Sequence, residues 1–206
     1  MKKLDIIYED KKIIVINKPY NTLTIGTDKD KIHCLYHEVH EYLYKKNQKV
    51  FIVHRLDRDT SGVILFAKDE GLKRRLQDNW DNYTREYRVV VHGKVKDDKG
   101  RIIEYLKENK EHHVYATNKG EGQIAITNYE VIKRFNKVTY LKIFIETGRK
   151  NQIRVALANL GHPILGDKKY GFKDKSPRMY LHAYRLVIDD KEYIAKLPKE
   201  FEIYEG

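Results

Sequence analysis

The stretch HRLDRDTSGVILFA, residues 54–67, joins a charged loop to an apolar run that is expected to form a strand. Residues 62–67 form an apolar run rich in β-branched side chains, which is typical of a buried β-strand. The loop before this run carries one histidine, two arginines and two aspartates. Because reactive groups often lie on loops at strand ends, this loop is the first candidate for a functional site.

Short apolar runs between polar residues predict further strands. They are residues 13–17 and 87–92, and two hairpins, residues 123–134 with 138–146 and residues 180–188 with 191–197. Apolar residues at helical spacing predict three helices, over residues 31–46, within 70–79 and over about 150–160, the last ended by Gly161. Strands and helices do not alternate regularly. The sequence therefore predicts an α+β fold with a mixed, largely antiparallel central sheet flanked by helices and loops.

Length and composition favour one compact domain over residues 1–206. The chain has only four prolines, no internal repeat and no low-complexity linker. Its single cysteine, Cys34, excludes an internal disulfide and a multi-cysteine zinc site, and we expect this thiol to be buried. No apolar run is long enough for a membrane span, and residues 1–20 do not resemble a signal peptide. We therefore expect a cytoplasmic protein.

The net charge favours a polyanionic partner, nucleic acid first and an acidic membrane surface second. Lys and Arg number 41 against 30 Asp and Glu, which gives +11. Residues 149–178 hold eight basic side chains against Asp167 and Asp174, whereas residues 189–206 hold three lysines against six acids. This asymmetry predicts one basic face, with Lys168, Lys169 and Lys173 contacting the partner. A solvated lysine-rich surface is the alternative.

Two segments carry side chains suited to chemistry. Asp57 lies between arginines, whose charge lowers the pKa of a carboxyl group, so it is an ionised candidate nucleophile or general base. The alternative is an aspartate that caps the turn. In residues 147–155, TGRKNQIRV, a glycine turn leads into a helix N-terminus that suits phosphate, and Arg154 could reach a carboxylate elsewhere. Here the alternative is an ordinary capped helix with an exposed arginine.

Several histidines and one tryptophan favour structural roles. His33, His37 and His40 have spacings of four and three, which could hold a metal, but no acid or cysteine partner is indicated. Surface or packing roles are therefore favoured, as they are for residues 112–113. We expect Trp80 to anchor the helix within 70–79.

Six blocks, in this order along the chain, resemble motifs of the RluA-type pseudouridine synthase family. They are NKP at 17–19, HRLD…TSG at 54–62, EYRVVVHG at 86–93, TGR…QIRV at 147–155, LGHPILGD…YG at 160–171, and R…LHA at 178–183. Together they span nearly the whole chain. The resemblance implies isomerisation of a specific uridine in structured RNA, ribosomal or transfer, by a single catalytic domain that needs no metal or cofactor. Because the first block lies close to the start of this sequence, we expect no separate N-terminal RNA-binding domain.

The resemblance also implies roles for individual residues. Asp57 corresponds to the catalytic aspartate, Tyr87 to the ring that stacks on the target base, and Arg154 to the partner of Asp57. Arg55 corresponds to the side chain that fills the gap left by the flipped uridine. The remaining expected contacts to RNA are His54, Arg149, Ile153 and Val155. Lys18 is expected to shape the floor of the cleft.

The reaction suits these residue types. Uracil must leave its ribose, turn and rejoin through carbon 5, which requires an ionised carboxylate, walls that retain the base and an acceptor for the carbon 5 proton. Asn151 and Ala156 stand where many family members have histidine, which leaves the support of Arg154 open. A non-catalytic RNA-binding or ribosome-assembly protein is therefore the alternative. A metal-dependent nuclease would need clustered acids to hold its metal, and this sequence indicates no such cluster. We expect a monomer.

Overall fold

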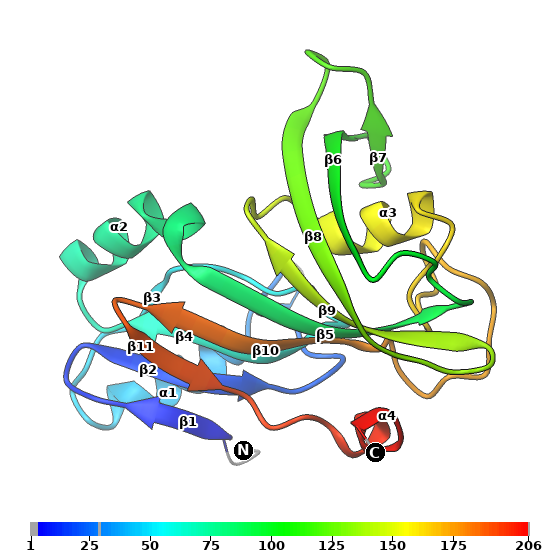
Figure 1. Cartoon of the computed structure of the whole chain (residues 1–206). Helices are drawn as coiled ribbons and strands as arrows, with labels where there is room; N and C mark the ends of the chain where they lie inside the picture. The colour runs from blue at the N-terminus through cyan, green and yellow to red at the C-terminus, as the bar shows by residue number, and fades with distance from the viewer. Residues whose placement is uncertain (1–3, 29, 206) are drawn as a thin grey trace. The chain divides into compact units, whose positions relative to one another are not determined.

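The computed structural model describes residues 4–28 and 30–205, and the chain divides into two compact units. The first unit comprises the residues up to Tyr83 together with Ala183–Leu197, and the second comprises Thr84–His182 together with the residues from Pro198 onward. Figure 1 shows the course of the chain and the labels of its helices and strands. The expectation of a single domain stays a prediction.

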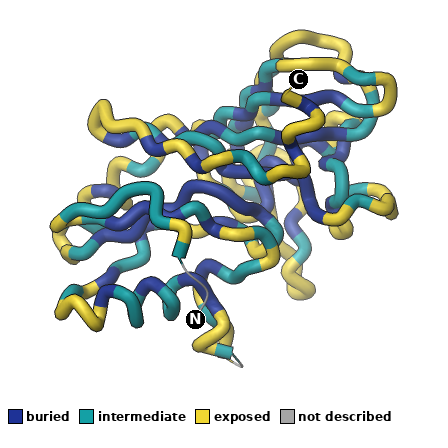
Figure 2. Tube along the Cα trace, turned by 90° about the horizontal axis from the view of Figure 1, so that it is seen from below, coloured by how far each residue is buried: buried dark blue, intermediate teal, exposed yellow. Residues whose placement is uncertain are grey.

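The first unit is built on strands in the order β1-β2-β4-β10, with β3 paired to β4 and β11 paired to β10. The strands are β1 (Ile6–Glu9), β2 (Ile13–Lys18), β3 (Phe51–Ile52), β4 (Ser61–Ala67), β10 (Leu181–Ile188) and β11 (Lys191–Ile194). β2 pairs antiparallel with both β1 and β4. All seven residues of β4 are buried, which explains the uninterrupted apolar run at residues 62–67. Figure 2 shows the contrast between such buried stretches and the exposed loops.

Two helices complete the first unit. α1 (Leu35–Tyr44) buries Leu35, Val39 and Leu43, which recur every four residues and so share one face. α2 (Glu70–Asp78) begins after Asp69, whose side chain accepts a hydrogen bond from Leu72 N at 2.8 Å. A short 3₁₀ turn, η1 (Trp80–Asn82), follows α2.

The second unit contains five strands in the order β5-β9-β8-β6-β7, and each neighbouring pair is antiparallel. The strands are β5 (Thr84–His92), β6 (Lys99–Glu108), β7 (Val114–Thr117), β8 (Gln123–Arg134) and β9 (Val138–Ile145). α3 (Gln152–Asn159) lies beside β6, β7 and β8 in Figure 1. Val155 of this helix joins Leu106, Val114 and Ala125 in one buried cluster. The last turns, η2 (Lys199–Phe201) and α4 (Glu202–Glu205), bring Phe201 and Tyr204 against Tyr140 and Tyr180.

The structure confirms the predicted strands and adds four that the sequence did not indicate, β1, β3, β6 and β7. The hairpin of β10 and β11 turns through Asp189 and Asp190, both with positive φ, as a two-residue hairpin turn requires. β6 was missed because its sequence, KGRIIEYLKE, is charged and only Leu106 in it is fully buried.

The first predicted helix begins later than expected. Residues 31–34 lie outside α1, and Cys34 precedes the helix in an extended conformation, with a parallel bridge to Leu23. Cys34 is buried as expected, but Ile32 is 57% exposed and takes no part in the apolar face. Ile32 fits the helical spacing, but the extended backbone of Cys34 and its bridge to Leu23 keep the segment before Leu35 out of the helix.

The third predicted helix ends where expected, with one correction. Gly161 has a φ of 86°, and His162 N donates to Leu157 O at 2.9 Å, which closes the helix in a left-handed cap. Leu160 lies within the range predicted for this helix, but it is past the end of α3 and is 37% exposed. None of the helices among residues 4–28 and 30–205 has the length and apolarity that a bilayer crossing requires.

Candidate active site

The loop that carries Asp57 connects β3 to β4 and is held at several points within the first unit. Thr60 N donates to the main-chain oxygen of Asp57 at 3.1 Å, which closes the turn. Before the turn, Leu56 is buried and its N–H and C=O both bond to the hydroxyl of Thr24, at 3.2 and 2.7 Å. Asp57 itself is half-buried, whereas Arg55 and Arg58 on either side are exposed. The backbone around Asp57 is therefore fixed by its neighbours.

Lys18 anchors this loop from the end of β2. Its side chain is fully buried, and its ammonium donates to the main-chain oxygens of Pro19, Thr22 and Arg58 at 3.1, 2.7 and 3.2 Å. A buried cation is costly unless it is hydrogen-bonded, and these carbonyl groups supply that compensation. The lysine thus ties the turn after β2 to the residue that follows Asp57.

His54 stands at the start of the loop and supports it. Its Nε2 accepts a hydrogen bond from Leu65 N of β4 at 3.0 Å, so this nitrogen carries no proton. Its ring stacks on Trp80 with 4.2 Å between centroids. Trp80 was expected to anchor α2; the structure places it in η1, against the ring of His54. A contact between His54 and RNA stays a prediction.

Tyr87 and Arg85 lie on β5 in the second unit, two residues apart and therefore on one face of the strand. Tyr87 is half-buried and stands opposite Ile143 of β9. Glu86 and Arg88 point to the other face, where they form an ion pair. Arg85 is buried and donates from Nη2 to Glu146 O at 3.0 Å. The strand therefore presents Tyr87 from a firmly bonded backbone.

Arg154 is buried on α3, so the alternative of an exposed arginine is wrong. Its Nε and Nη2 donate to Asp167 Oδ2 and Oδ1, both at 2.8 Å, in a two-point ion pair. Its Nη1 donates to Asn151 Oδ1 at 3.0 Å. Arg154 and Asp57 belong to different units, and their pairing stays a prediction. Asp167 was not predicted to pair with Arg154, although it lies in the motif at residues 160–171.

The ion pair sets the charge of Asp167. Burial raises the pKa of this carboxyl group, but the hydrogen bonds and charge of Arg154 and the N–H groups of Lys169 and Tyr170 outweigh burial, so the pKa lies below its usual value. Asp167 is therefore ionised at neutral pH and fixes one edge of the Arg154 guanidinium.

The side chain of Gln152 bridges the turn before α3. Its side-chain oxygen accepts from Thr147 Oγ1 at 2.7 Å and from Arg149 N at 3.0 Å. Its amide nitrogen donates to Ile126 O and Thr127 Oγ1 of β8. The N–H of Arg149, one of the donors expected to suit phosphate, is thus used within the protein.

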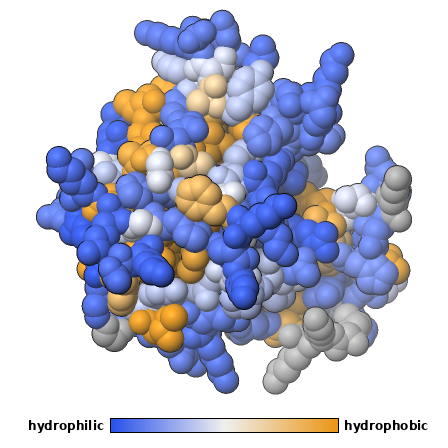
Figure 3. Space-filling view, turned by 90° about the vertical axis from the view of Figure 1, so that its right-hand side faces the viewer, coloured by the Kyte–Doolittle hydropathy of each residue, from blue (hydrophilic) through white to orange (hydrophobic). Residues whose placement is uncertain are grey.

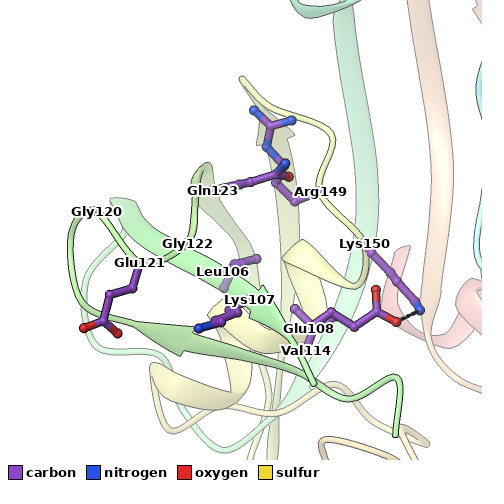
Figure 4. Close-up of a pocket in the computed structure, with 10 residues that line it drawn as sticks. All are labelled: Leu106, Lys107, Glu108, Val114, Gly120, Glu121, Gly122, Gln123, Arg149 and Lys150. Carbon is purple, nitrogen blue, oxygen red and sulfur yellow. Dashed lines mark hydrogen bonds and ion pairs between the residues drawn. The ribbon is translucent and has the colours of Figure 1, made fainter. Parts of the chain in front are cut away.

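A surface pocket of about 460 Å³ lies between the ends of β6, β7 and β8 and the start of the segment leading to α3 (Figure 4). Its lining residues are Leu106, Lys107, Glu108, Val114, Gly120, Glu121, Gly122, Gln123, Arg149 and Lys150. Leu106 and Val114 are buried and form an apolar part of the wall. Lys150 pairs with Glu108, as the dashed line in Figure 4 marks. The predicted contact residue Arg149 therefore borders a pocket whose walls carry basic, acidic and apolar side chains.

The basic segment carries exposed lysines beside well-bonded acids. Lys168, Lys169 and Lys173 are exposed, and Lys169 Nζ donates to His112 O at 2.7 Å. Burial raises the pKa of Asp174, but hydrogen bonds from Gly166 N, Ser176 and His92 outweigh it and lower the pKa to about 2. In Figure 3, hydrophilic side chains predominate on the face shown, with apolar groups between them.

Ile153 and Val155, the expected walls for the base, are both buried. Val155 packs in the cluster of α3 and the strands beside it, and a role beside the base stays a prediction for both residues.

His33 is exposed and bonds to Asp30 at 2.9 Å, which agrees with a surface role. Within the described part of the chain, no group of three or more His, Cys, Asp or Glu side chains is arranged to hold a metal.

Comparisons with known proteins agree with the fold and the motifs. The family model of RNA pseudouridylate synthases matches residues 12–159. An uncharacterized RNA pseudouridine synthase of Aquifex aeolicus is 38% identical over 184 residues, 84% of this chain and 58% of the relative. The ribosomal large subunit pseudouridine synthase D of Borreliella burgdorferi is 33% identical over 217 residues, 97% of this chain and 67% of the relative. The chain thus spans roughly three fifths to two thirds of the length of these relatives.

Solved structures confirm the predicted fold class. The human RNA pseudouridylate synthase domain containing 4 superposes with a TM-score of 0.81 at 23% identity, over 95% of this chain and 89% of that one. The human RNA pseudouridylate synthase domain containing 1 superposes with a TM-score of 0.80 at 21% identity, over 100% of this chain and 87% of that one. The architecture is thus that of a pseudouridine synthase, with a mixed, mostly antiparallel sheet and few helices. The chain belongs to the RluA-type family of these isomerases.

Proposed function

We propose that this protein converts a specific uridine of structured RNA to pseudouridine, with Asp57 as the catalytic carboxylate. The observation that carries the proposal is the loop of residues 54–62, in which the family motif coincides with a backbone fixed by Lys18 and Thr24. An attacking group must be held in place to be effective, and this loop is held on both sides of Asp57. Membership of the family supports the reaction class.

The proposed reaction breaks the bond from ribose C1′ to uracil N1 and forms a bond from C1′ to uracil C5. A base then removes the proton from C5, and N1 gains a proton, so that the product is an isomer of the substrate. No electrons are gained or lost. Asp57 acts as nucleophile at C1′ or as proton acceptor on the sugar, and both routes need its ionised form. Tyr87 stacks on the base, and Arg154 pairs with Asp57. Ile153 and Val155 add apolar wall around the freed uracil.

RNA recognition is proposed to rest on the basic side chains. Arg55 is exposed, as a side chain that fills the gap of a flipped base must be. Lys168, Lys169 and Lys173 are exposed as well, and Arg149 borders the pocket of Figure 4. The names of several relatives refer to the large ribosomal subunit, which favours ribosomal over transfer RNA. We propose that the protein works as a monomer in the cytoplasm.

The test compares Asp57→Asn with Asp59→Asn, a matched change in the same loop. Both proteins are incubated with ribosomal and transfer RNA from a strain that lacks the gene, and pseudouridine is mapped by chemical labelling and primer extension. We expect Asp59→Asn to retain activity, and Asp57→Asn to lose about a thousand-fold or more in single-turnover rate while melting at an unchanged temperature. An active Asp57→Asn protein would overturn the assignment.

A second candidate function, non-catalytic RNA binding in ribosome assembly, is favoured only by Asn151 and Ala156 in place of the histidines. It predicts that the wild-type protein binds RNA and forms no pseudouridine in either RNA pool. It also predicts that Asp57→Asn restores the phenotype of a deletion strain as well as the wild-type gene does.

A further inference from the structure

Asn151 lies at a backbone position that few residues adopt without strain. Its φ is 54° and ψ 16°, immediately before α3, and its side chain is buried. Among residues other than glycine, asparagine, aspartate and histidine are the ones enriched in this left-handed region. The backbone alone therefore restricts position 151 to a small set that includes the histidine of many relatives.

The hydrogen bonds of Asn151 restrict the set further. Its oxygen accepts from Arg154 Nη1 at 3.0 Å, and its Nδ2 donates to the hydroxyl of Tyr170 at 3.2 Å. Arginine has donors and no acceptor, so the amide oxygen must face Arg154 and the amide nitrogen must face Tyr170. Position 151 thus accepts on one side and donates on the other. Asparagine and neutral histidine each carry one acceptor and one donor, and so offer the group types of both contacts.

Tyr170 contacts the same guanidinium from another direction. The ring centroid is 5.0 Å from Arg154 Cζ, which places the cation over the aromatic face. The tyrosine hydroxyl also accepts from Val114 N of β7 at 3.1 Å, and the ring of His113 lies 4.9 Å from that of Tyr170. One side chain therefore connects Arg154, Asn151 and the strand β7.

Three groups together restrain Arg154. Asp167 holds Nε and Nη2, Asn151 holds Nη1, and the Arg154 Cζ atom lies over the Tyr170 ring. Edge contacts alone leave the guanidinium free to tilt, and the aromatic face limits that tilt. A planar group with five donors must be oriented in this way if it is to present one edge to a partner.

We propose that Asn151 and Tyr170 are positioning residues for Arg154, and that Asn151 acts through both groups of its side-chain amide. The inference rests on the proposed function, in which Arg154 assists Asp57. It predicts that side chains at 151 are interchangeable only when they tolerate a positive φ and combine an acceptor with a donor.

The variants separate the side chain from the backbone. Asn151→Gly keeps the left-handed conformation and removes both hydrogen bonds. Asn151→His restores an acceptor and a donor, and Tyr170→Phe keeps the ring but removes the hydroxyl. Asn47→Gly is the matched control, because exposed Asn47 also has a positive φ, 55°. Tyr115→Phe on β7 controls for loss of a tyrosine hydroxyl.

Two measurements are made on each protein: single-turnover pseudouridine formation at saturating enzyme with the RNA Kd, and the NMR signal of the Arg154 Nε–H group. We expect Asn151→Gly and Tyr170→Phe to slow the single-turnover rate about tenfold with the RNA Kd within about twofold of wild type, because an interaction made with the reacting state is removed. Their Arg154 Nε–H signals should exchange faster with water. Asn151→His and both controls should match the wild type in both measurements.

Rates within about twofold of wild type for Asn151→Gly and Tyr170→Phe would overturn the proposal, as would an Asn151→His protein as impaired as Asn151→Gly. Loss of RNA affinity with an unchanged rate would assign these residues to binding instead. If the wild-type protein forms no pseudouridine, the proposed function fails, and the NMR signal still tests whether Asn151 and Tyr170 orient Arg154.

Discussion

The buried ammonium of Lys18 donates a hydrogen bond to the main-chain oxygen of Arg58, which lies 40 residues further along the chain and next to Asp57. From the sequence, Lys18 was expected only to shape the floor of a cleft. The contacts give it a more specific task, since the same ammonium also holds Pro19 and Thr22. The position of Asp57 thus depends on a charge that takes no part in the proposed chemistry.

Replacing that charge should disturb both stability and catalysis. Lys18→Met leaves three carbonyl oxygens without this donor, and we expect the free energy of unfolding to fall by about 2 kcal/mol or more. The single-turnover rate should fall as well, because the Asp57 loop loses an anchor. Urea titration measures the first effect, and Lys11→Met, at an exposed lysine nearby, should change neither quantity. A fully active Lys18→Met protein would show that the Asp57 loop keeps its conformation without Lys18.

Gly62 should not tolerate a side chain. Its φ is 116°, and an added Cβ would lie 2.1 Å from the main-chain oxygen of Ala183. We expect Gly62→Ala to destabilise the protein by about 3 kcal/mol or more, since backbone strain and a backbone clash add together. Gly120→Ala is the control, because Gly120 has a φ of 92° with no atom within 4 Å of an added Cβ. Equal melting temperatures for the two variants would contradict the clash.

Acid should weaken the first unit through Glu9. Burial raises the pKa of Glu9, but hydrogen bonds from Lys68, Lys46 and Tyr42 outweigh it and lower the pKa from 4.5 to about 2. Because the folded-state pKa is the lower one, this stabilisation is complete above pH 4.5 and is lost as the pH falls toward 2. Glu9→Gln should therefore reduce the free energy of unfolding at about pH 7 and change it less at about pH 3. Equal losses at both pH values would argue against the shift.

The exposed lysines of the basic segment should govern the salt dependence of RNA binding. In the triple variant Lys168→Gln, Lys169→Gln, Lys173→Gln, we expect weaker binding and a salt slope that falls by about 0.7 to 0.9 for each RNA phosphate that is no longer neutralised. Single-turnover chemistry at saturating enzyme should stay within about twofold of wild type, because phosphate contacts position RNA without touching the reacting bonds. Filter binding at several salt concentrations measures the slope. The matched triple variant at Lys191, Lys196 and Lys199, in the acidic C-terminal region, should leave it unchanged.

The elements that could be predicted from the sequence are those in which burial leaves a regular pattern of apolar residues. β4 and the middle of β5 are apolar because they are buried, and their sequences show it. β6 and β7 are largely exposed, so their side chains reflect contact with solvent and the strands were missed. The start of α1 was predicted too early because the apolar spacing extends back to Ile32, before the helix begins at Leu35.

Motif spacing identified the loop of Asp57 and the helix of Arg154, but not what holds them. Asp167 and Tyr170 follow Arg154 by 13 and 16 residues and meet it only because the segment after α3 folds back. Similarly, no local pattern couples Lys18 to Arg58. Side-chain contacts between distant segments depend on the folded path, which periodicity along the chain does not reveal.

The interleaving of the two units bears on how the protein is made. Residues 84–182 separate the two segments of the first unit, so this unit cannot be completed until residue 197 has left the ribosome. Until then β4, buried along its whole length in the finished fold, lacks its neighbour β10. Such long-range pairing slows folding and leaves apolar strands open to aggregation. During synthesis, protection of β4 by chaperones should matter more for yield than the stability of the finished fold.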